Sequence, residues 1–492
     1  MIEPFPVEEI RQALMNALPD PDQATAAPQQ DAPFTYVPQS HALALDPENS
    51  IVEGIRGAGK SFWWAALVSE SHRRFVASAF PETKIGTNIL PQQGFGSSPS
   101  LLYPSKDTIA RLVEKKFDAR HIWRAVIAAQ IELSPPYPEK SMKWEEKVGW
   151  AREHPEELDT LLFQRNTELG QQDKVRLILF DALDRLADDW AAIRPLARSL
   201  FQVALDFRGY QNIRLKIFVR PDMLEDREIL HFPDSSKLLA RKIALVWRRA
   251  DLYALVFQCL GNARTGGDAF RNHFTKEFGL SWDYDAANTA WVLPRDLRTD
   301  EDLQKKVFHA ITGPAMASGA SGHKRGFPYT WLPNHLLDGK SQVSPRSFCA
   351  ALRSASRQDA LKDWGYPLDY MAIKAGVQEA SRIRVNEITR EDYPWIETVM
   401  TPLRNRITVP CSESDIITLW GQENIIAKLR TQIEGDVVKL PPQHIDEGPR
   451  GILNDLEALG VIQFLSGGRV QMPDVYRIAF SLGRRGGVRP LR

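Results

Sequence analysis

The chain is poor in cysteine and carries no excess of either charge. Three of its 492 residues are cysteine, and they stand far apart at Cys259, Cys349 and Cys411. An odd number of distant cysteines indicates reduced thiols and argues against a disulfide framework or a cysteine metal site. The 62 basic residues balance the 62 acidic ones. This excludes a protein whose whole surface coats a polyanion, so any contact with nucleic acid has to come from a local patch.

Long apolar runs are also missing. No run reaches the roughly 18 residues that a membrane helix needs. The N-terminus, MIEPFPVEEIRQAL, has neither the basic start nor the apolar stretch of a signal peptide. We therefore expect a cytoplasmic protein without a membrane partner. Hydrophobic residues at 43% and charged residues at 25% exclude wholesale disorder, and the length allows two to four domains.

Short apolar runs alternate with helical patterns from about residue 34 to residue 247. The runs are apolar enough to be buried on both faces, as in a parallel sheet, so the pattern predicts an α/β fold. The predicted strands are Ser50–Glu53, Val175–Phe180, Ile213–Val219 and Ile243–Trp247. The helices predicted between them include Ser61–Arg74, Thr108–Leu133 and Asp188–Phe207.

Composition divides the chain into four predicted parts. Residues 1–33 hold a short amphipathic helix and a linker rich in Pro, Ala and Gln. Residues 34–248 form the α/β core, 249–394 a mostly helical domain and 395–492 a small separate domain. Within the core, the segment from Glu82 to Lys106 contains GFGSSPS, and we predict that it is a mobile surface loop.

The strongest motif of the chain follows the first predicted strand. The sequence GIRGAGKS over 54–61 fits the phosphate-binding loop G-x-x-x-x-G-K-[ST], and its strand–loop–helix setting is the one such a loop requires. The glycines let successive N–H groups point at one phosphate, and the following helix directs its positive end there. The residues predicted to bind the nucleotide are Gly54, Arg56, Gly57, Ala58, Gly59, Lys60, Ser61 and Phe62.

Three of the predicted residues carry distinct chemistry. The Lys60 ammonium would lie on the β- and γ-phosphates, and the Ser61 hydroxyl would ligate Mg²⁺. The predicted strand 175–180 ends in Asp181. A phosphate-binding loop needs such an acidic residue, at the end of a neighbouring strand, to hold the hydrated Mg²⁺. The alternative is that Asp181 only caps the next helix.

The motifs GIRGAGKS and LILFDALDRL together resemble the KAP and STAND-like P-loop ATPases, a branch of the AAA+-related proteins. KAP-type proteins typically read D-D-L-D-R after the strand, and this chain matches at Asp181, Leu183, Asp184 and Arg185. The departure is Ala182, where the related ATPases carry an acid that polarises the attacking water. The resemblance therefore implies a slow ATPase. Asp184 either replaces the missing acid or pairs structurally with an arginine, and both alternatives stay open.

The resemblance extends to two arginines. Arg220 follows the strand 213–219, where STAND-like ATPases place a residue that senses the γ-phosphate; the alternative is a surface arginine at a strand end. Ser344-Pro345-Arg346 opens a helical run and is similar to a helix start in the lid of KAP-type ATPases. Arg346 would then make the lid position depend on the bound nucleotide; the alternative is an ordinary helix-opening arginine.

Residues 412–492 resemble a winged-helix domain. Helical patterns precede LNDLEALGVI and a Gly467-Gly468 turn, which predicts a wing hairpin over 461–472. In DNA-binding winged helices the helix before the wing enters the major groove, but here Asp455 and Glu457 are expected on its exposed positions, where they would oppose phosphate. A role in packing or in docking a partner is therefore favoured over contact with DNA, and these alternatives stay open. The local basic residues are Arg469, Arg484, Arg485, Arg489 and Arg492.

Together these features predict an ATP-binding, Mg²⁺-dependent P-loop ATPase with a helical lid, acting as a nucleotide-controlled conformational switch. Family association suggests bacterial defence or genome maintenance. ATP is expected rather than GTP because no N-K-x-D motif stands in a suitable place. One alternative is a nucleic-acid-binding regulator that uses ATP only to set its conformation, and another is a kinase-like transferase. The expected partners are an unidentified protein, DNA through the C-terminal domain, and further copies of the chain in a nucleotide-dependent oligomer.

Overall fold

The computed structural model describes residues 2–20, 31–319, 321–359, 361, 363–435, 440–484, 488 and 490, apart from the side chain of residue 391. Most of the predicted N-terminal linker, residues 21–30, lies outside the described residues. The chain forms two compact units. The sheet unit comprises Ala24–Ala32 and Val37–Val246, and the helical unit comprises Met1–Gln23, Pro33–Tyr36 and Trp247–Arg492. None of the helices in the described ranges has the length and apolar character that crossing a membrane requires.

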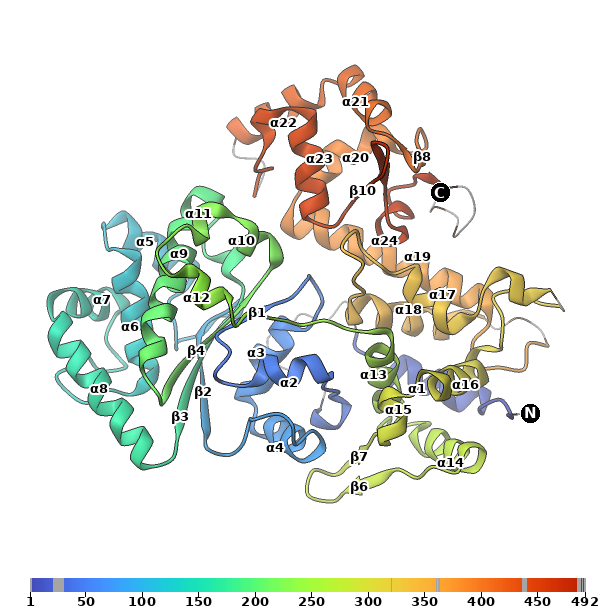
Figure 1. The fold of residues 1–492 in the computed structure, drawn as a ribbon, viewed down its shortest axis with the longest axis horizontal. Coiled ribbons are helices and arrows are strands. Elements are labelled where there is room, and N and C mark those ends of the chain that lie inside the picture. Colours follow the sequence, from blue (N-terminus) through green and yellow to red (C-terminus); the bar gives the residue numbers. More distant parts are fainter. Residues whose placement is uncertain are drawn as a thin grey trace. The chain divides into compact units, whose positions relative to one another are not determined.

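The sheet unit contains five parallel strands in the order β2-β3-β4-β1-β5 (Figure 1), which confirms the predicted α/β class. From β1 the chain passes to the edge strand β2, returns through β3 and β4, and then places β5 on the other side of β1. In the central strand β4, Ile217 pairs with Ile51 on one side and with Phe180 on the other. The strands are β1 Ile51–Glu53, β2 Ile89–Phe95, β3 Val175–Phe180, β4 Ile213–Val219 and β5 Ile243–Ala244.

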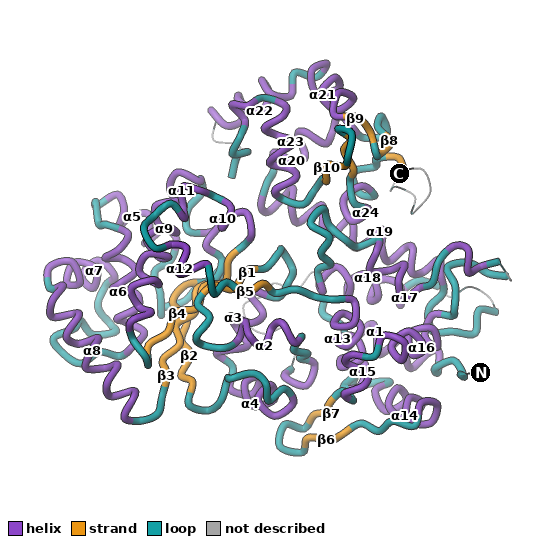
Figure 2. The backbone as a smooth tube through the Cα atoms, in the orientation of Figure 1, coloured by secondary structure: helices purple, strands orange, loops and turns teal. Residues whose placement is uncertain are grey.

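The inner strands are formed by buried apolar residues. Strand β3 reads VRLILF, and its last four residues have no exposed surface. Such burial is expected when helices lie on both sides of a parallel sheet, as Figure 2 shows for this unit. The helices of eight or more residues are α3 Lys60–Val68, α4 Glu70–Ala79, α5 Lys106–Glu114, α6 Ala119–Ile131, α7 Trp144–Glu153, α8 Pro155–Gln171 and α9 Trp190–Asp206. The shorter ones are α2 Gln39–Leu45, α10 Pro221–Glu225, α11 Arg227–Leu230 and α12 Ser235–Leu239.

Two predicted helices are each divided in two. The helix predicted over 61–74 is interrupted at Ser69, which is the N-cap of α4. The helix predicted over 108–133 is two helices, because α5 ends at Glu114 and α6 begins at Ala119. At the start of α6 the side chain of Asp118 accepts a hydrogen bond from the backbone N–H of Arg120. An N-cap residue satisfies amides that a continuous helix would have bonded internally, so it marks a new helix start.

The predicted mobile loop between Glu82 and Lys106 is wrong over Ile89–Phe95, which forms the edge strand β2. Its sequence, ILPQQGF, carries a proline and two polar residues that hide the strand pattern. An edge strand tolerates these residues because one of its sides has no neighbouring strand to bond. Strand β2 pairs with β3 from Ile89↔Val175 to Phe95↔Phe180.

Glycines let this segment approach the core closely. A Cβ on Gly94 would lie 2.6 Å from the ring of Phe180, and a Cβ on Gly96 would overlap the ring of Trp64. Trp64 is 2% exposed, and its indole N–H donates to the Leu179 carbonyl at 3.3 Å. The middle of the predicted loop, at Gly94 and Gly96, is therefore packed against β3 and α3.

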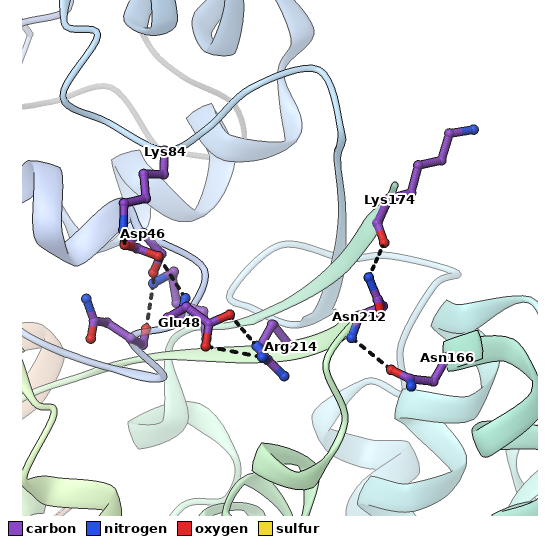
Figure 3. A network of polar contacts seen from close by, with 9 residues as sticks. Asp46, Glu48, Lys84, Asn166, Lys174, Asn212 and Arg214 are labelled. Carbon is purple, nitrogen blue, oxygen red and sulfur yellow. Dashed lines mark hydrogen bonds and ion pairs between the residues drawn. The ribbon is translucent and has the colours of Figure 1, made fainter. Parts of the chain in front are cut away.

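Polar contacts join the loops that precede the strands (Figure 3). The Arg214 guanidinium binds the Glu48 carboxylate at 2.8 Å, and the Lys84 ammonium binds that of Asp46 at 2.8 Å. The Asn212 side chain donates to the Lys174 carbonyl at 3.0 Å, and its backbone N–H donates to Asn166 Oδ1 at 2.8 Å. These contacts lie at the amino ends of β1, β3 and β4, whereas the predicted site residues follow the carboxyl ends of these strands.

Lys216 lies inside this sheet and has no exposed surface. Its Nζ donates to the carbonyls of Ala44 at 2.6 Å, Asp46 at 3.0 Å and Asn49 at 2.6 Å. Burial lowers the pKa of Lys216 to about 7, against the opposing effect of the nearby Asp46 and Glu48 carboxylates. The side chain thereby connects the end of α2 and the entry to β1 with the middle of β4.

We expect Lys216→Met to lower the free energy of unfolding by about 2 kcal/mol or more, because buried carbonyls lose their donor. The pKa predicts a pH signature as well. Between about pH 7 and pH 10 the unfolded lysine keeps a proton that the buried lysine has released, so the wild type should become more stable relative to the variant as the pH rises. Urea unfolding of both proteins at pH 7 and pH 9.5 measures this. An equal stability difference at the two pH values would contradict the lowered pKa.

The helical unit contains one N-terminal helix and the helices that follow β5. Helices α18 and α19 cross closely because Gly376 has no side chain where a Cβ would overlap the Ala351 carbonyl. A small antiparallel hairpin also forms from β6 Asp283–Asp285 and β7 Ala290–Val292. The helices are α1 Val7–Ala17, α13 Arg249–Gly261, α14 Gly267–Phe278, α15 Arg295–Thr299, α16 Glu301–Thr312, α17 Pro328–Asn334, α18 Pro345–Arg357, α19 Tyr370–Asn386 and α20 Trp395–Met400.

The C-terminal end of this unit has the predicted winged-helix-like arrangement. Three helices are followed by a hairpin that pairs with an earlier strand, in the sheet order β10-β11-β9. In the turn between β10 and β11, Gly467 and Gly468 have φ values of 77° and 67°, a conformation that favours glycine. The elements are β8 Thr408–Val409, β9 Cys411–Ser412, α21 Glu413–Gln422, α22 Ile425–Glu434, α23 Pro449–Ala458, β10 Gln463–Leu465, β11 Arg469–Gln471, α24 Asp474–Arg477 and β12 Gly483–Arg484.

Candidate functional site

The carboxyl ends of three neighbouring strands carry most of the predicted site. Gly54 follows β1, Asp181 follows β3 and Arg220 follows β4. Because β4 lies between β3 and β1, Arg220 stands between the other two positions. The neighbouring strands β1 and β4 connect onward in opposite directions along the sheet, β1 to β2 and β4 to β5, and ligands of open parallel sheets bind outside the carboxyl ends at such a point.

The loop after β1 has the backbone of an anion site. Gly57 and Gly59 have φ values of 76° and 105°, and these left-handed conformations curl the chain tightly. The Gly54 N–H donates to the Val219 carbonyl at 3.1 Å, and the Ala58 N–H donates to the Ile55 carbonyl at 3.1 Å. Helix α3 begins directly after the loop, so its free N–H groups and dipole face the same space.

The Lys60 side chain folds back over this loop. Its Nζ donates to the carbonyls of Gly54 at 2.7 Å and Ile55 at 3.0 Å. Burial is the main reason that the pKa of Lys60 falls to about 8, and Arg220 lowers it further, while the Asp181 carboxylate opposes the shift. An ammonium held by two carbonyls beside N–H groups of a loop can exchange them for phosphate oxygens.

Ser61 and Asp181 meet directly. The Ser61 hydroxyl donates to Asp181 Oδ2 at 2.6 Å, although the two residues are 120 positions apart. Asp181 is 3% exposed; burial raises its pKa, and the Ser61 hydrogen bond and the Lys60 charge work in the opposite direction. Ala182, not Asp181, occupies the N-cap position of the following turn. Asp181 therefore does not have the N-cap position that the capping alternative requires.

Asp184 and Arg220 form an ion pair. Arg220 Nη1 donates to Asp184 Oδ2 at 3.0 Å. Arg220 is 9% exposed, so it is not a surface residue, and its Nε and Nη2 bind both oxygens of Asp222 at 3.1 and 2.8 Å. Sequence reasoning missed Asp222, although it stands in the same Arg-Pro-Asp sequence at the strand end.

The remaining predicted loop residues line the turn and the first helical turn. Ala58 is buried, and Arg56 and Phe62 are partly exposed. The Phe62 ring packs edge-on against the rings of Trp63 and His72, with centroids 5.1 and 6.0 Å apart. Phe62 therefore contributes to packing of α3 beside the loop.

Arg346 belongs to the helical unit. It lies in the first turn of α18, as the Pro-Arg motif predicts, and Ser344 is the N-cap. The Arg346 Nη1 donates to Glu387 Oε1 at 2.7 Å. Its role toward a nucleotide stays a prediction.

The structure places some of the charged residues that the sequence analysis singled out in the C-terminal module. The predicted exposure of Asp455 is wrong: it is 6% exposed and binds the Nδ1 of His444 at 2.6 Å, because the preceding loop folds over α23. Arg484 binds Asp474 at 3.0 Å, whereas Arg469 is exposed on the wing. Three predicted basic residues, Arg485, Arg489 and Arg492, lie outside the described residues.

No protein-family model and no curated protein matches the chain. Four chains of solved structures match it. One is Cdc6p from Pyrobaculum aerophilum, with 12% identity, a TM-score of 0.28 and coverage of 91% of this chain and 94% of that one. Another is the ORC2 protein of Aeropyrum pernix in its ADPNP–ADP complexes, with 12% identity, a TM-score of 0.37 and coverage of 90% and 93%. At these values the likeness is distant and assigns the chain to no family.

Proposed function

We propose that the chain is an ATP-binding, Mg²⁺-dependent P-loop ATPase that acts as a nucleotide-controlled conformational switch. The observation that carries this proposal is the 2.6 Å hydrogen bond between Ser61 and Asp181, next to the loop that holds Lys60. A glycine-rich turn that binds no ligand does not require a buried carboxylate from another strand beside it. Hydroxyl, carboxylate and ammonium converge here as a phosphate–metal site requires.

Each residue of the loop has a role toward the phosphates. The N–H groups of Gly57, Gly59, Lys60 and Ser61 would surround the β-phosphate, since Gly57 and Gly59 turn the backbone around one point. Lys60 would release the carbonyls of Gly54 and Ile55 and bind the β- and γ-phosphates. The N-terminus of α3 would add its dipole to the same charge.

The oxygen atoms of Ser61 and Asp181 fit Mg²⁺. This hard cation prefers oxygen ligands and keeps several waters, which one carboxylate and one hydroxyl allow. Ser61 would ligate it directly, and Asp181 would hold its bound water. When bound, the cation neutralises charge that develops on the phosphate oxygens during transfer.

Hydrolysis by this site should be slow. Water would attack the γ-phosphorus, the bond to the bridging oxygen would break, and the water proton would pass to the phosphate. Ala182 carries no group to orient that water, and its φ of 56° and ψ of 42° lie in the left-handed region. Asp184, two residues further along the chain, is bound to Arg220.

We therefore expect basal turnover well below the enzyme median of about 10 per second. Phosphate release from saturating Mg-ATP measures it, and equal amounts of ADP and phosphate would distinguish hydrolysis from transfer to another acceptor. Rapid turnover that survives Asp184→Asn would mean that the catalytic acid lies elsewhere.

For the C-terminal module we propose packing or partner docking, with DNA contact as the alternative. Its described basic residues are partly engaged: Arg450 pairs with Glu413 and lies over the Phe464 ring at 4.4 Å. Arg469 remains exposed on the wing. Binding of duplex DNA at several salt concentrations tests the regulator alternative, since phosphate contacts weaken steeply with salt. A role in defence or genome maintenance rests on the resemblance of the two motifs alone.

A further inference from the structure

Arg220 is bound by two carboxylates in different ways. Asp222 uses both of its oxygens, which bind Nε and Nη2 in parallel. Asp184 uses one oxygen, which binds Nη1 at 3.0 Å. A parallel pair of hydrogen bonds fixes a guanidinium more firmly than a single one. Asp222 is therefore the stronger holder of Arg220, and Asp184 is the weaker.

The exposure and local structure of the two acids also indicate that Asp222 holds Arg220 more firmly than Asp184 does. The Asp222 side chain is 9% exposed and sits in the first turn of α10, two residues from Arg220. The Asp184 side chain is 17% exposed and lies in a three-residue 3₁₀ turn that follows the left-handed Ala182. The Arg220–Asp184 contact can thus be exchanged without disturbing the Arg220–Asp222 contact.

The charges of this cluster oppose an incoming polyphosphate. The cluster contains two positive groups, Lys60 and Arg220, and three carboxylates, those of Asp181, Asp184 and Asp222. The guanidinium and the three carboxylates each influence the pKa of Lys60. A terminal phosphate would add negative charge beside the carboxylates. The repulsion between this phosphate and the carboxylates is offset if Arg220 Nη1 leaves Asp184 and donates to the phosphate instead.

We propose that Asp184 and the terminal phosphate of ATP compete for Arg220, while Asp222 keeps the guanidinium in place as a positioning residue. The inference rests on the proposed nucleotide site. ADP lacks the competing phosphate, so it leaves the Arg220–Asp184 pair closed. ATP opens the pair and releases the Asp184 carboxylate, three residues after Asp181, from Arg220.

The test is the preference for ATP over ADP, measured with a non-hydrolysable ATP analogue and ADP, each with Mg²⁺, by titration calorimetry of the full chain. Asp184→Asn should raise this preference about fivefold or more, because the competitor loses its charge. Asp222→Asn should lower it, since the guanidinium is no longer held. Arg220→Met should remove it, and adding Asp184→Asn to Arg220→Met should change nothing further. The matched control is Asp226→Asn, which breaks the 2.8 Å Arg194–Asp226 pair outside the site and should leave the preference unchanged.

A second measurement needs no variant. Hydrogen exchange of the peptide covering 182–188 in the wild type should increase with the ATP analogue and not with ADP. If Asp184→Asn changes both affinities equally, and exchange is the same with both nucleotides, the competition does not exist and Asp184 is structural, while the nucleotide site stands. Failure of the wild type to bind either nucleotide would instead overturn the proposed function and this inference together.

Discussion

Lys60→Ala is expected to abolish measurable ATP binding. The substitution removes the ammonium that folds over the loop and that would bind the β- and γ-phosphates once it releases the Gly54 and Ile55 carbonyls. The wild type should gain about 2.7 kcal/mol of stability at an ATP concentration 100 times its Kd, and the variant should gain none.

Thermal unfolding with and without Mg-ATP measures this difference. Lys216→Met is the matched control, because Lys216 is also a buried lysine bound to backbone carbonyls but contacts 44–49 instead of the loop. The control should melt at a lower temperature and still be stabilised by ATP. Unchanged ATP affinity in Lys60→Ala would refute the phosphate-loop assignment.

Asp181→Asn is expected to retain ATP binding and to lose on the order of 10–100-fold in Mg²⁺-dependent turnover. The amide is nearly isosteric with the carboxylate, and its oxygen can still accept a hydrogen bond from the Ser61 hydroxyl. It carries no charge, however, so it holds hydrated Mg²⁺ weakly. Loss of the buried carboxylate should not weaken the fold, since burial already raises its pKa and disfavours its charged form.

Single-turnover hydrolysis across a Mg²⁺ titration separates the two effects. The variant should need a higher Mg²⁺ concentration for half-maximal rate, while its affinity for Mg²⁺-free ATP matches that of the wild type. Normal turnover with an unchanged Mg²⁺ requirement would show that Asp181 does not hold the metal.

Sequence patterns predicted those elements in which local chemistry and burial agree. Strands β3 and β4 have the predicted bounds because VRLILF and IRLKIFV are mostly apolar and bounded by polar residues. Strand β2 escaped prediction, since an edge strand can carry Pro91 and two glutamines. The exposed position predicted for Asp455 was wrong because a loop eleven residues away supplies its partner, His444.

The phosphate loop could be derived from the sequence alone, because eight consecutive residues contain all the dihedral freedom and charge that it needs. The partners of that loop could not. Strand order places Arg220 between Gly54 and Asp181, and it brings Asp184 to Arg220 across 36 residues. Whether Asp184 contacts water, metal or arginine depends on which strands are neighbours. Strand neighbours are decided by packing over the whole sheet, so only the tertiary structure could show that Asp184 and Asp222 share one guanidinium.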